Sequence, residues 1–222
     1  MNAARLTEEA VNAEVLRIGR QGATALAGYV AISSASYSIA DAFFYDSDGL
    51  YLVLSIVVWG LGYALLVLLM QGSARYEEGP RGGIGGYFGL GIVSGIAVGI
   101  GLIILIIPGL FLVVRWLPAY ARYYAKGDGV TEALAWSWRE TAPFQMPLAI
   151  AAIGPFVCYG AFFGIAALQE FYAADWSEAA YYVSIIALNL TISVAIAWLQ
   201  LLGVAAYRII ELRSSEPVDV FE

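Results

Sequence analysis

The chain has 222 residues, of which 61% are hydrophobic and only 13% are charged, with a net charge of −7. Several apolar runs exceed the roughly 18 residues that a helix needs to cross a bilayer. About a quarter of the residues of an ordinary water-soluble domain would be charged, so the composition excludes that class. The sequence contains no histidine, which excludes imidazole-based catalysis and metal ligation. It predicts an all-α polytopic membrane protein that forms a single membrane domain over residues 1–222.

The first predicted element is a short interfacial helix over residues 6–20. Thr7 is its expected N-cap, Glu8 and Glu9 lie in the favourable first turn, and apolar residues recur along one stripe. A cleaved signal peptide begins with basic residues, whereas this segment is acidic. We therefore expect the apolar segment that follows to remain in the membrane.

Six transmembrane helices are predicted from the apolar runs between polar loops. Their approximate ranges are 22–44, 50–70, 86–107, 109–125, 145–168 and 180–207. The stretch 86–125 is too long for one crossing, and Pro108 and Gly109 lie near its middle. Because proline lacks a donor and glycine permits unusual dihedral angles, we predict that this pair forms the turn of a helical hairpin. A re-entrant hairpin, whose tip stops short of the outer surface, is the alternative.

A second interfacial helix is predicted over residues 131–141, capped by Thr131 and ended by Pro143, with Trp136 and Trp138 suited to the membrane interface. With six spans, the basic residues of the loops all fall on the side of both termini, and the opposite loops carry acidic residues. Lys and Arg accumulate in cytoplasmic loops. We therefore expect a bacterial inner (cytoplasmic) membrane protein with both termini in the cytoplasm.

Three glycines form a GxxxGxxxG pattern in the third predicted span: Gly91, Gly95 and Gly99. Small residues at this spacing share one helix face and let another helix approach closely. Helix packing within the chain is the favoured interpretation. A contact with a second copy, or with a partner membrane protein, is the alternative.

Arg115 and Asp41 are the candidate polar site inside the membrane, because each is a charged residue within a predicted span. A buried arginine costs roughly 2.5–3.5 kcal/mol on insertion scales, so something should compensate for its charge. Three interpretations stay open. Arg115 pairs with Asp41, or it faces water or a lipid headgroup, or it snorkels or binds backbone carbonyls.

A set of short motifs is concentrated in residues 106–141. They are IPG at 107–109, VR at 114–115, GDG at 127–129, EAL at 132–134 and SW at 137–138. With these motifs the segment resembles a bacterial integral-membrane family, the membrane domain of glycerophosphoryl diester phosphodiesterases and its uncharacterised stand-alone relatives. The resemblance implies an all-helical membrane domain, fused in some members to a phosphodiesterase domain. The chain has neither the length nor the histidines of that catalytic domain, so we do not expect the hydrolytic activity to carry over.

The favoured function is a non-enzymatic inner-membrane scaffold or lipid-interacting module of envelope maintenance. The lack of a catalytic constellation in the sequence, the aromatic interfacial segment and the domain fusions of the family favour it. Membrane lipids are the expected partners, and no cofactor, metal or nucleic acid is expected. A small-molecule or lipid transporter, or the substrate-binding subunit of one, is the alternative, favoured by the interrupted hairpin and the intramembrane arginine. An intramembrane enzyme ranks third, since Asp41 and Glu170 form no closely spaced acidic pair.

Overall fold

The computed structural model of the protein describes residues 7–44, 46–71 and 82–214, and all the regular elements in these residues are helices. In chain order they are α1 (Glu8–Gln21), α2 (Ala23–Phe43), α3 (Asp48–Gln71), α4 (Ile84–Ile104), α5 (Ile106–Trp116), α6 (Ala119–Lys126), α7 (Val130–Glu140), η1 (Ala142–Phe144), α8 (Gln145–Ala151), α9 (Ile153–Tyr172), η2 (Ala173–Asp175) and α10 (Glu178–Ser214). The predicted all-α class is confirmed.

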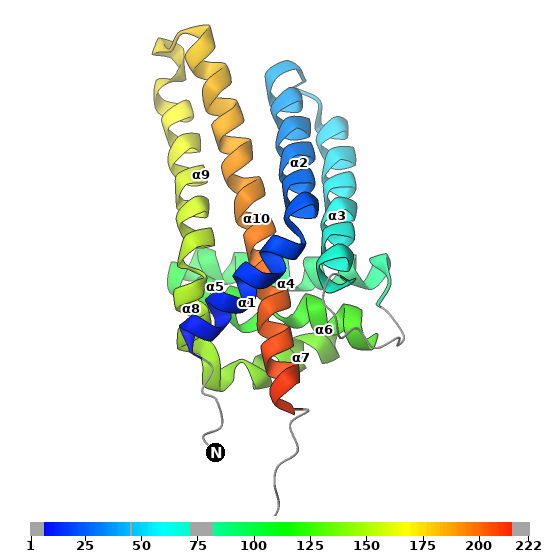
Figure 1. Cartoon of the computed structure of the whole chain (residues 1–222). Coiled ribbons are helices and arrows are strands. Elements are labelled where there is room, and N and C mark those ends of the chain that lie inside the picture. Colours follow the sequence, from blue (N-terminus) through cyan, green and yellow to red (C-terminus); the bar gives the residue numbers. More distant parts are fainter. Residues whose placement is uncertain (1–6, 45, 72–81, 215–222) are drawn as a thin grey trace, which may run out of the picture.

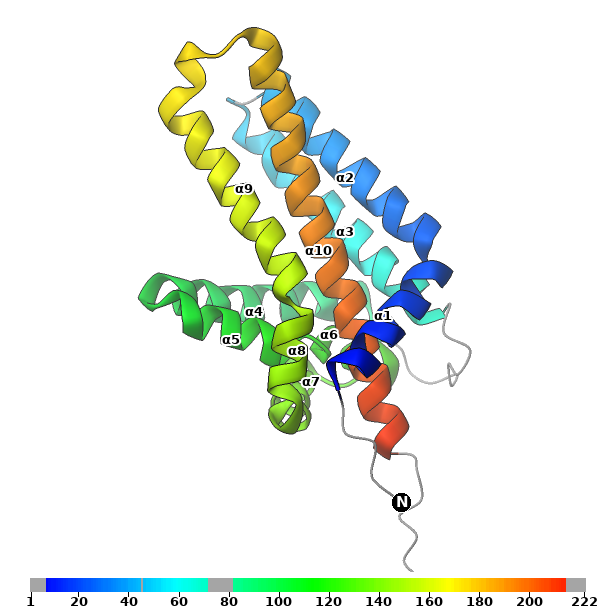
Figure 2. The ribbon, with the colours of Figure 1, turned by 60° about the vertical axis from the view of Figure 1, so that its left-hand side comes forward.

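Two antiparallel hairpins stand upright and side by side, one formed by α2 and α3 and the other by α9 and α10 (Figure 1). Helix α10 packs against both α9 and α2 and so joins the hairpins. Helices α4 and α5 pair with each other and lie crosswise to the upright helices in both views (Figure 2). We call α1 together with α4 to α8 the basal layer. It surrounds the C-terminal part of α10, so the fold consists of an upright bundle with shorter helices across one end.

Four helices of the described chain are long and apolar enough to cross a membrane. They cover Asp48–Gln71, Ile84–Ile104, Ile153–Asp175 and Glu178–Leu212. Large apolar side chains on the outside of these helices are exposed, including Ile56 on α3, Val157 on α9 and Val183 on α10. Exposed apolar surface of this extent is expected where a protein faces lipid. The protein is therefore embedded in a membrane.

Composition and arrangement disagree about which fourth helix crosses the membrane together with α3, α9 and α10. Helix α2 stands upright with them but carries Ser33, Ser34, Ser36 and Ser38, which make it less apolar than its neighbours. Helix α4 is apolar enough to cross but lies crosswise. If the upright bundle crosses the bilayer, α2 crosses with it, and α4 and α5 lie along the bilayer on the side of α1.

The predicted spans 22–44, 50–70 and 180–207 correspond to α2, α3 and most of α10. The fifth span was predicted over 145–168, but the long helix there begins only at Ile153. The chain bends at Ala152, and Pro155 follows in the first turn of α9, where a missing N–H is tolerated.

The span predicted over 109–125 is wrong as a single helix. The chain breaks at Leu117 and Pro118 into α5, with 11 residues, and α6, with eight. Each is shorter than the roughly 20 residues of a crossing helix. At the break, the hydroxyls of Ser137 and Thr141 donate to the carbonyl oxygen of Arg115, at 2.7 and 3.1 Å. Side chains of the basal layer thus take the place of the missing helical hydrogen bonds.

The chain does reverse between α4 and α5, but the turn lies at Leu105 and not at Pro108 and Gly109. Leu105 is extended, with φ −158° and ψ 134°. Pro108 lies in the first turn of α5. Gly109 faces α4, where a Cβ atom would come within 2.7 Å of the backbone nitrogen of Leu102. Proline therefore begins the second helix, and glycine lets the two helices approach closely.

Helices, α1 and α7, form in both segments for which interfacial helices were predicted. Thr7 caps α1, accepting a hydrogen bond from the backbone N–H of Ala10 at 3.3 Å, as predicted. The N-cap of α7 is Gly129 and not Thr131, which lies within the first turn. The backbone N–H of Gly129 donates to the carboxylate of Glu132 at 2.8 Å, so the acidic residue supplies the capping interaction expected from threonine.

Selective labelling can test the crosswise hairpin. In a Cys158→Ala background, Ser47→Cys and Ala174→Cys should react with an impermeant maleimide from one side of the membrane, and Glu140→Cys from the other. Leu105→Cys, at the tip between α4 and α5, should not react from the side of Ser47. Reaction of Leu105→Cys together with Ser47→Cys would instead mean that the hairpin crosses the membrane.

A carboxylate joins α1 to α10. Arg17 donates to Glu14 through Nε at 2.8 Å and Nη2 at 2.6 Å, and Arg208 Nε lies 3.3 Å from the same carboxylate. The hydrogen bond from Arg17 is the main cause that lowers the pKa of Glu14, against the opposing effect of burial. Because the folded-state pKa is depressed, Glu14 stabilises the fold at neutral pH. That contribution is fully present above the unfolded-state pKa of about 4. It is lost as the pH falls through the lower pKa of the folded protein.

We therefore expect Glu14→Gln to cost about 1 kcal/mol at pH 7 and to have little effect at a pH low enough to protonate Glu14. Thermal denaturation in detergent at both pH values measures this. The exposed Glu9→Gln, on the same helix, is the control and should lose only the smaller interaction of an acidic residue with the first turn. An equal loss for Glu14→Gln at both pH values would show that its carboxylate charge contributes nothing.

Candidate binding cavity

A cavity of about 840 Å³ lies between the two upright hairpins. Its walls come from α2, α3, α9 and α10, and α4, α5 and α6 contribute side chains from the basal layer. The volume falls within the range of small-molecule sites, roughly 300–1,000 Å³. Most of the lining is apolar, with Val58, Leu66, Phe162, Ile192 and Ile196 among the side chains that surround it.

One polar cluster of the cavity centres on Asp41 of α2. Its two carboxylate oxygens accept hydrogen bonds from the hydroxyl of Tyr51 and from Nδ2 of Asn189, each at 2.6 Å. Asn189 Nδ2 also donates to the carbonyl of Ile185 at 3.1 Å. The carboxylate thus ties α2 to α3 and α10, and Asp41 is the one charged side chain among the described residues that line the cavity.

A second polar cluster lies towards the basal layer. Gln200 donates through Nε2 to the hydroxyl of Tyr87 at 2.7 Å, and the hydroxyls of Ser94 and Tyr120 are 3.0 Å apart. The Oε1 atom of Gln200 is buried and has no hydrogen-bond partner among the described residues. Gln200 follows Asn189 on α10 by 11 residues, a separation of about 16 Å along the helix. The cavity therefore has polar groups at two depths and apolar walls between them.

The structure does not bring the two members of the predicted polar site together. Both oxygens of Asp41 are engaged by Tyr51 and Asn189, and Arg115 is not part of the cavity lining. Val113 and Trp116 of α5 face the cavity, whereas Arg115 lies against Trp138 of α7, its Cζ 4.4 Å from the ring centroid. The actual partner of Asp41 is Asn189. The one signal for it in the sequence is that a polar residue occurs in the last predicted span at a depth similar to that of Asp41.

The glycine pattern of α4 faces mostly open space. A Cβ atom on Gly91 would come within 3.3 Å of the Trp59 ring, but no heavy atom lies within 4 Å of such an atom on Gly95 or Gly99. Gly91 and Gly95 line the cavity instead. The close glycine contacts of α4 are made nearer its two ends. A Cβ atom on Gly86 would collide with the side chain of Tyr123, and one on Gly101 would lie 3.0 Å from Cα of Gly109. The expected packing face is therefore partly cavity wall, and the packing glycines lie on either side of it along the helix.

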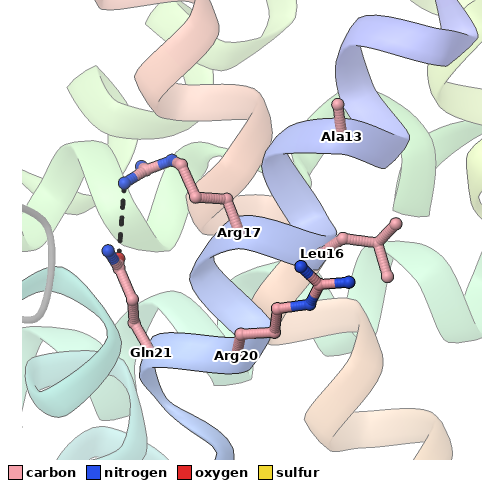
Figure 3. Close-up of a pocket in the computed structure, with 5 residues that line it drawn as sticks. All are labelled: Ala13, Leu16, Arg17, Arg20 and Gln21. Carbon is pink, nitrogen blue, oxygen red and sulfur yellow. Dashed lines mark hydrogen bonds between the residues drawn. The ribbon is translucent and has the colours of Figure 1, made fainter.

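A shallow surface groove lies on α1, lined by Ala13, Leu16, Arg17, Arg20 and Gln21 (Figure 3). All five residues come from one helix. Arg17 donates to the Gln21 side chain at 3.3 Å and is also bound to Glu14. The groove has no second wall, so it is the exposed surface of a single helix and not a built binding site.

No group of three or more His, Cys, Asp or Glu side chains within the described ranges could hold a metal ion. No known protein family, curated protein or solved structure matches the chain. The resemblance of residues 106–141 to the phosphodiesterase membrane domain stays a prediction. The fold and the cavity define the protein as an all-helical membrane-embedded protein with a cavity between two helical hairpins.

Proposed function

We propose that the protein is a non-enzymatic, lipid-interacting module of the inner membrane that holds one amphiphilic molecule between its upright hairpins. The observation that carries this proposal is the cavity of about 840 Å³, with apolar walls and polar groups at two depths. An amphiphile pairs its chain with such walls and its headgroup with such polar groups. A purely structural module of packed helices would fill this volume with side chains.

The polar groups decide which amphiphile fits. Moving an acyl chain from the bilayer into an apolar cavity changes its surroundings little, so the chain alone supplies little affinity. Selectivity then comes from hydrogen bonds to Asp41 and to the free Oε1 of Gln200, which are both acceptors. A headgroup that donates, such as a hydroxyl or an ammonium group, suits them. A carboxylate headgroup would meet the charge of Asp41.

The placement in the membrane follows from charge. The basal end carries Arg17, Arg20, Lys126, Arg139 and Arg208, and the opposite connections carry acidic residues. Under the positive-inside tendency, the basal layer and both termini lie in the cytoplasm. Membrane lipids are the partners of the exposed apolar surface, and association with a second copy or another membrane protein is part of the scaffold role.

A transporter, or the substrate-binding subunit of one, is the second candidate. It is favoured by the position of the two polar clusters, which lie at different depths between hairpins joined mainly through α10. Transfer of a fluorescent monoacylglycerol analogue between leaflets of proteoliposomes would support this function. Binding without transfer supports the scaffold.

The proposal is tested by filling the cavity. Gly95→Leu should project into it without a clash, and Gly99→Leu, one turn further and outside the lining, is the matched control. Native mass spectrometry should show that the wild type and Gly99→Leu bind a monoacylglycerol more tightly than a fatty acid of the same chain length. Gly95→Leu should lose most of this binding. Equal binding by both variants would contradict a ligand in the cavity.

A further inference from the structure

The side chain of Arg115 is an unpartnered buried cation. It is only 7% exposed, and its Nε and Nη1 atoms are buried with no hydrogen-bond partner among the described residues. Its Cζ atom lies 4.4 Å from the ring centroid of Trp138 and 5.6 Å from that of Phe111. Cation–π contacts of this kind stabilise the charge over the ring faces, but they leave the in-plane N–H donors without acceptors.

The backbone of this arginine is fixed. Its carbonyl oxygen accepts hydrogen bonds from the hydroxyls of Ser137 and Thr141, both buried. These residues lie on α7 or directly after it, and Trp138 lies on α7 as well. Three contacts from one short segment therefore hold Arg115 in place. A guanidinium held in this way is preorganised to receive an acceptor.

No carboxylate in the described part of the chain forms an ion pair with it. Glu14 binds Arg17 and Arg208, Asp128 binds Arg122, and Glu211 lies 2.7 Å from Lys126. On α7 itself, Glu132 accepts from the backbone of Gly129, and Glu140 is exposed. An uncompensated buried charge destabilises a fold, so an external anion would stabilise this arrangement.

We propose that Arg115 is the centre of a phosphate-binding site between α5 and α7. The site lies on the face of α5 that points away from the cavity, in the basal layer, and is independent of the proposed cavity ligand. Trp138 covers the guanidinium and is itself 39% exposed, so it is the side chain that would move aside for a phosphate oxygen to reach the buried donors. Arginine binds phosphate through charge-assisted hydrogen bonds. The phosphate comes from a phospholipid headgroup or from free phosphate.

The test compares phosphate sources on the full chain in detergent. Thermal stability is measured with inorganic phosphate, with phosphatidylglycerol and with diacylglycerol, which has the same chains but no phosphate. Phosphatidylglycerol and not diacylglycerol should stabilise the wild type. Equal stabilisation by inorganic phosphate would assign the site to free phosphate, and stabilisation by the lipid alone would assign it to a headgroup. If neither phosphate source exceeds diacylglycerol, the proposal is overturned without recourse to a variant.

Substitutions then test whether the phosphate binds at Arg115. Arg115→Gln should weaken binding of the phosphate source at least tenfold. Arg139→Gln removes the same charge from an exposed position one residue beyond Trp138 and should change binding less than about threefold. Arg115→Lys keeps the charge and provides a second variant if Arg115→Gln does not fold, and it should bind more weakly than the wild type. Equal losses in Arg115→Gln and Arg139→Gln would assign phosphate binding to general surface charge, and wild-type affinity in Arg115→Lys would contradict binding through the guanidinium.

Discussion

Gly203→Ala should destabilise the protein by about 1–3 kcal/mol, although it adds a single methyl group. Gly203 is buried in α10, where this helix crosses the break between α5 and α6. A Cβ atom there would collide with the carbonyl oxygen of Leu117 and lie 3.2 Å from its carbonyl carbon. Both atoms belong to the backbone, so no rotamer change can relieve the contact. Thermal denaturation in detergent measures the loss.

The control is Gly160→Ala on α9, where no atom lies within 4 Å of the added Cβ. Alanine is favoured over glycine within a helix by roughly 0.5–1 kcal/mol, so this variant should be neutral or slightly stabilised. A similar Tm for Gly203→Ala and Gly160→Ala would show that α10 does not pack on Leu117.

Gly109→Ala should open the hairpin formed by α4 and α5. The new methyl group would collide with the side chain of Leu102 and lie 2.7 Å from its backbone nitrogen. We expect a loss of about 1–3 kcal/mol from this overpacking. The matched control is Gly99→Ala on α4, where the added atom meets open space. If Pro108 and Gly109 formed only a turn, Gly109→Ala would behave like this control.

Local signals in the sequence were sufficient for much of the fold. Thr7 followed by two acidic residues predicted the start of α1, and mainly apolar runs between polar loops predicted α2, α3 and most of α10. These features act within a few residues of one another. The Pro-Gly pair was misassigned because proline is equally at home in a turn and in the first turn of a helix. Glycine is likewise used both in turns and at close helix contacts.

The candidate site depended on contacts that no local pattern specifies. Asp41 was identified as a polar residue inside a span, but Asn189 lies on the last helix and reaches it only through the packing of α10 on α2. Arg115 was identified by its charge, and Trp138 by its suitability for the interface. Their contact requires the chain to reverse between α5 and α7. The cavity itself follows from the spacing of two hairpins and has no signature in the sequence.

An amphiphile in the cavity between the hairpins should be captured there by a photoreactive lipid. A diazirine-bearing monoacylglycerol would be added to the protein in nanodiscs, irradiated, and its attachment sites mapped by peptide mass spectrometry. If the cavity is occupied, cavity residues such as Tyr159 and Ser193 should be labelled saturably, and excess unlabelled monoacylglycerol should suppress this labelling. Labelling confined to outward side chains such as Phe163 and Val183, and unaffected by the competitor, would contradict occupancy of the cavity.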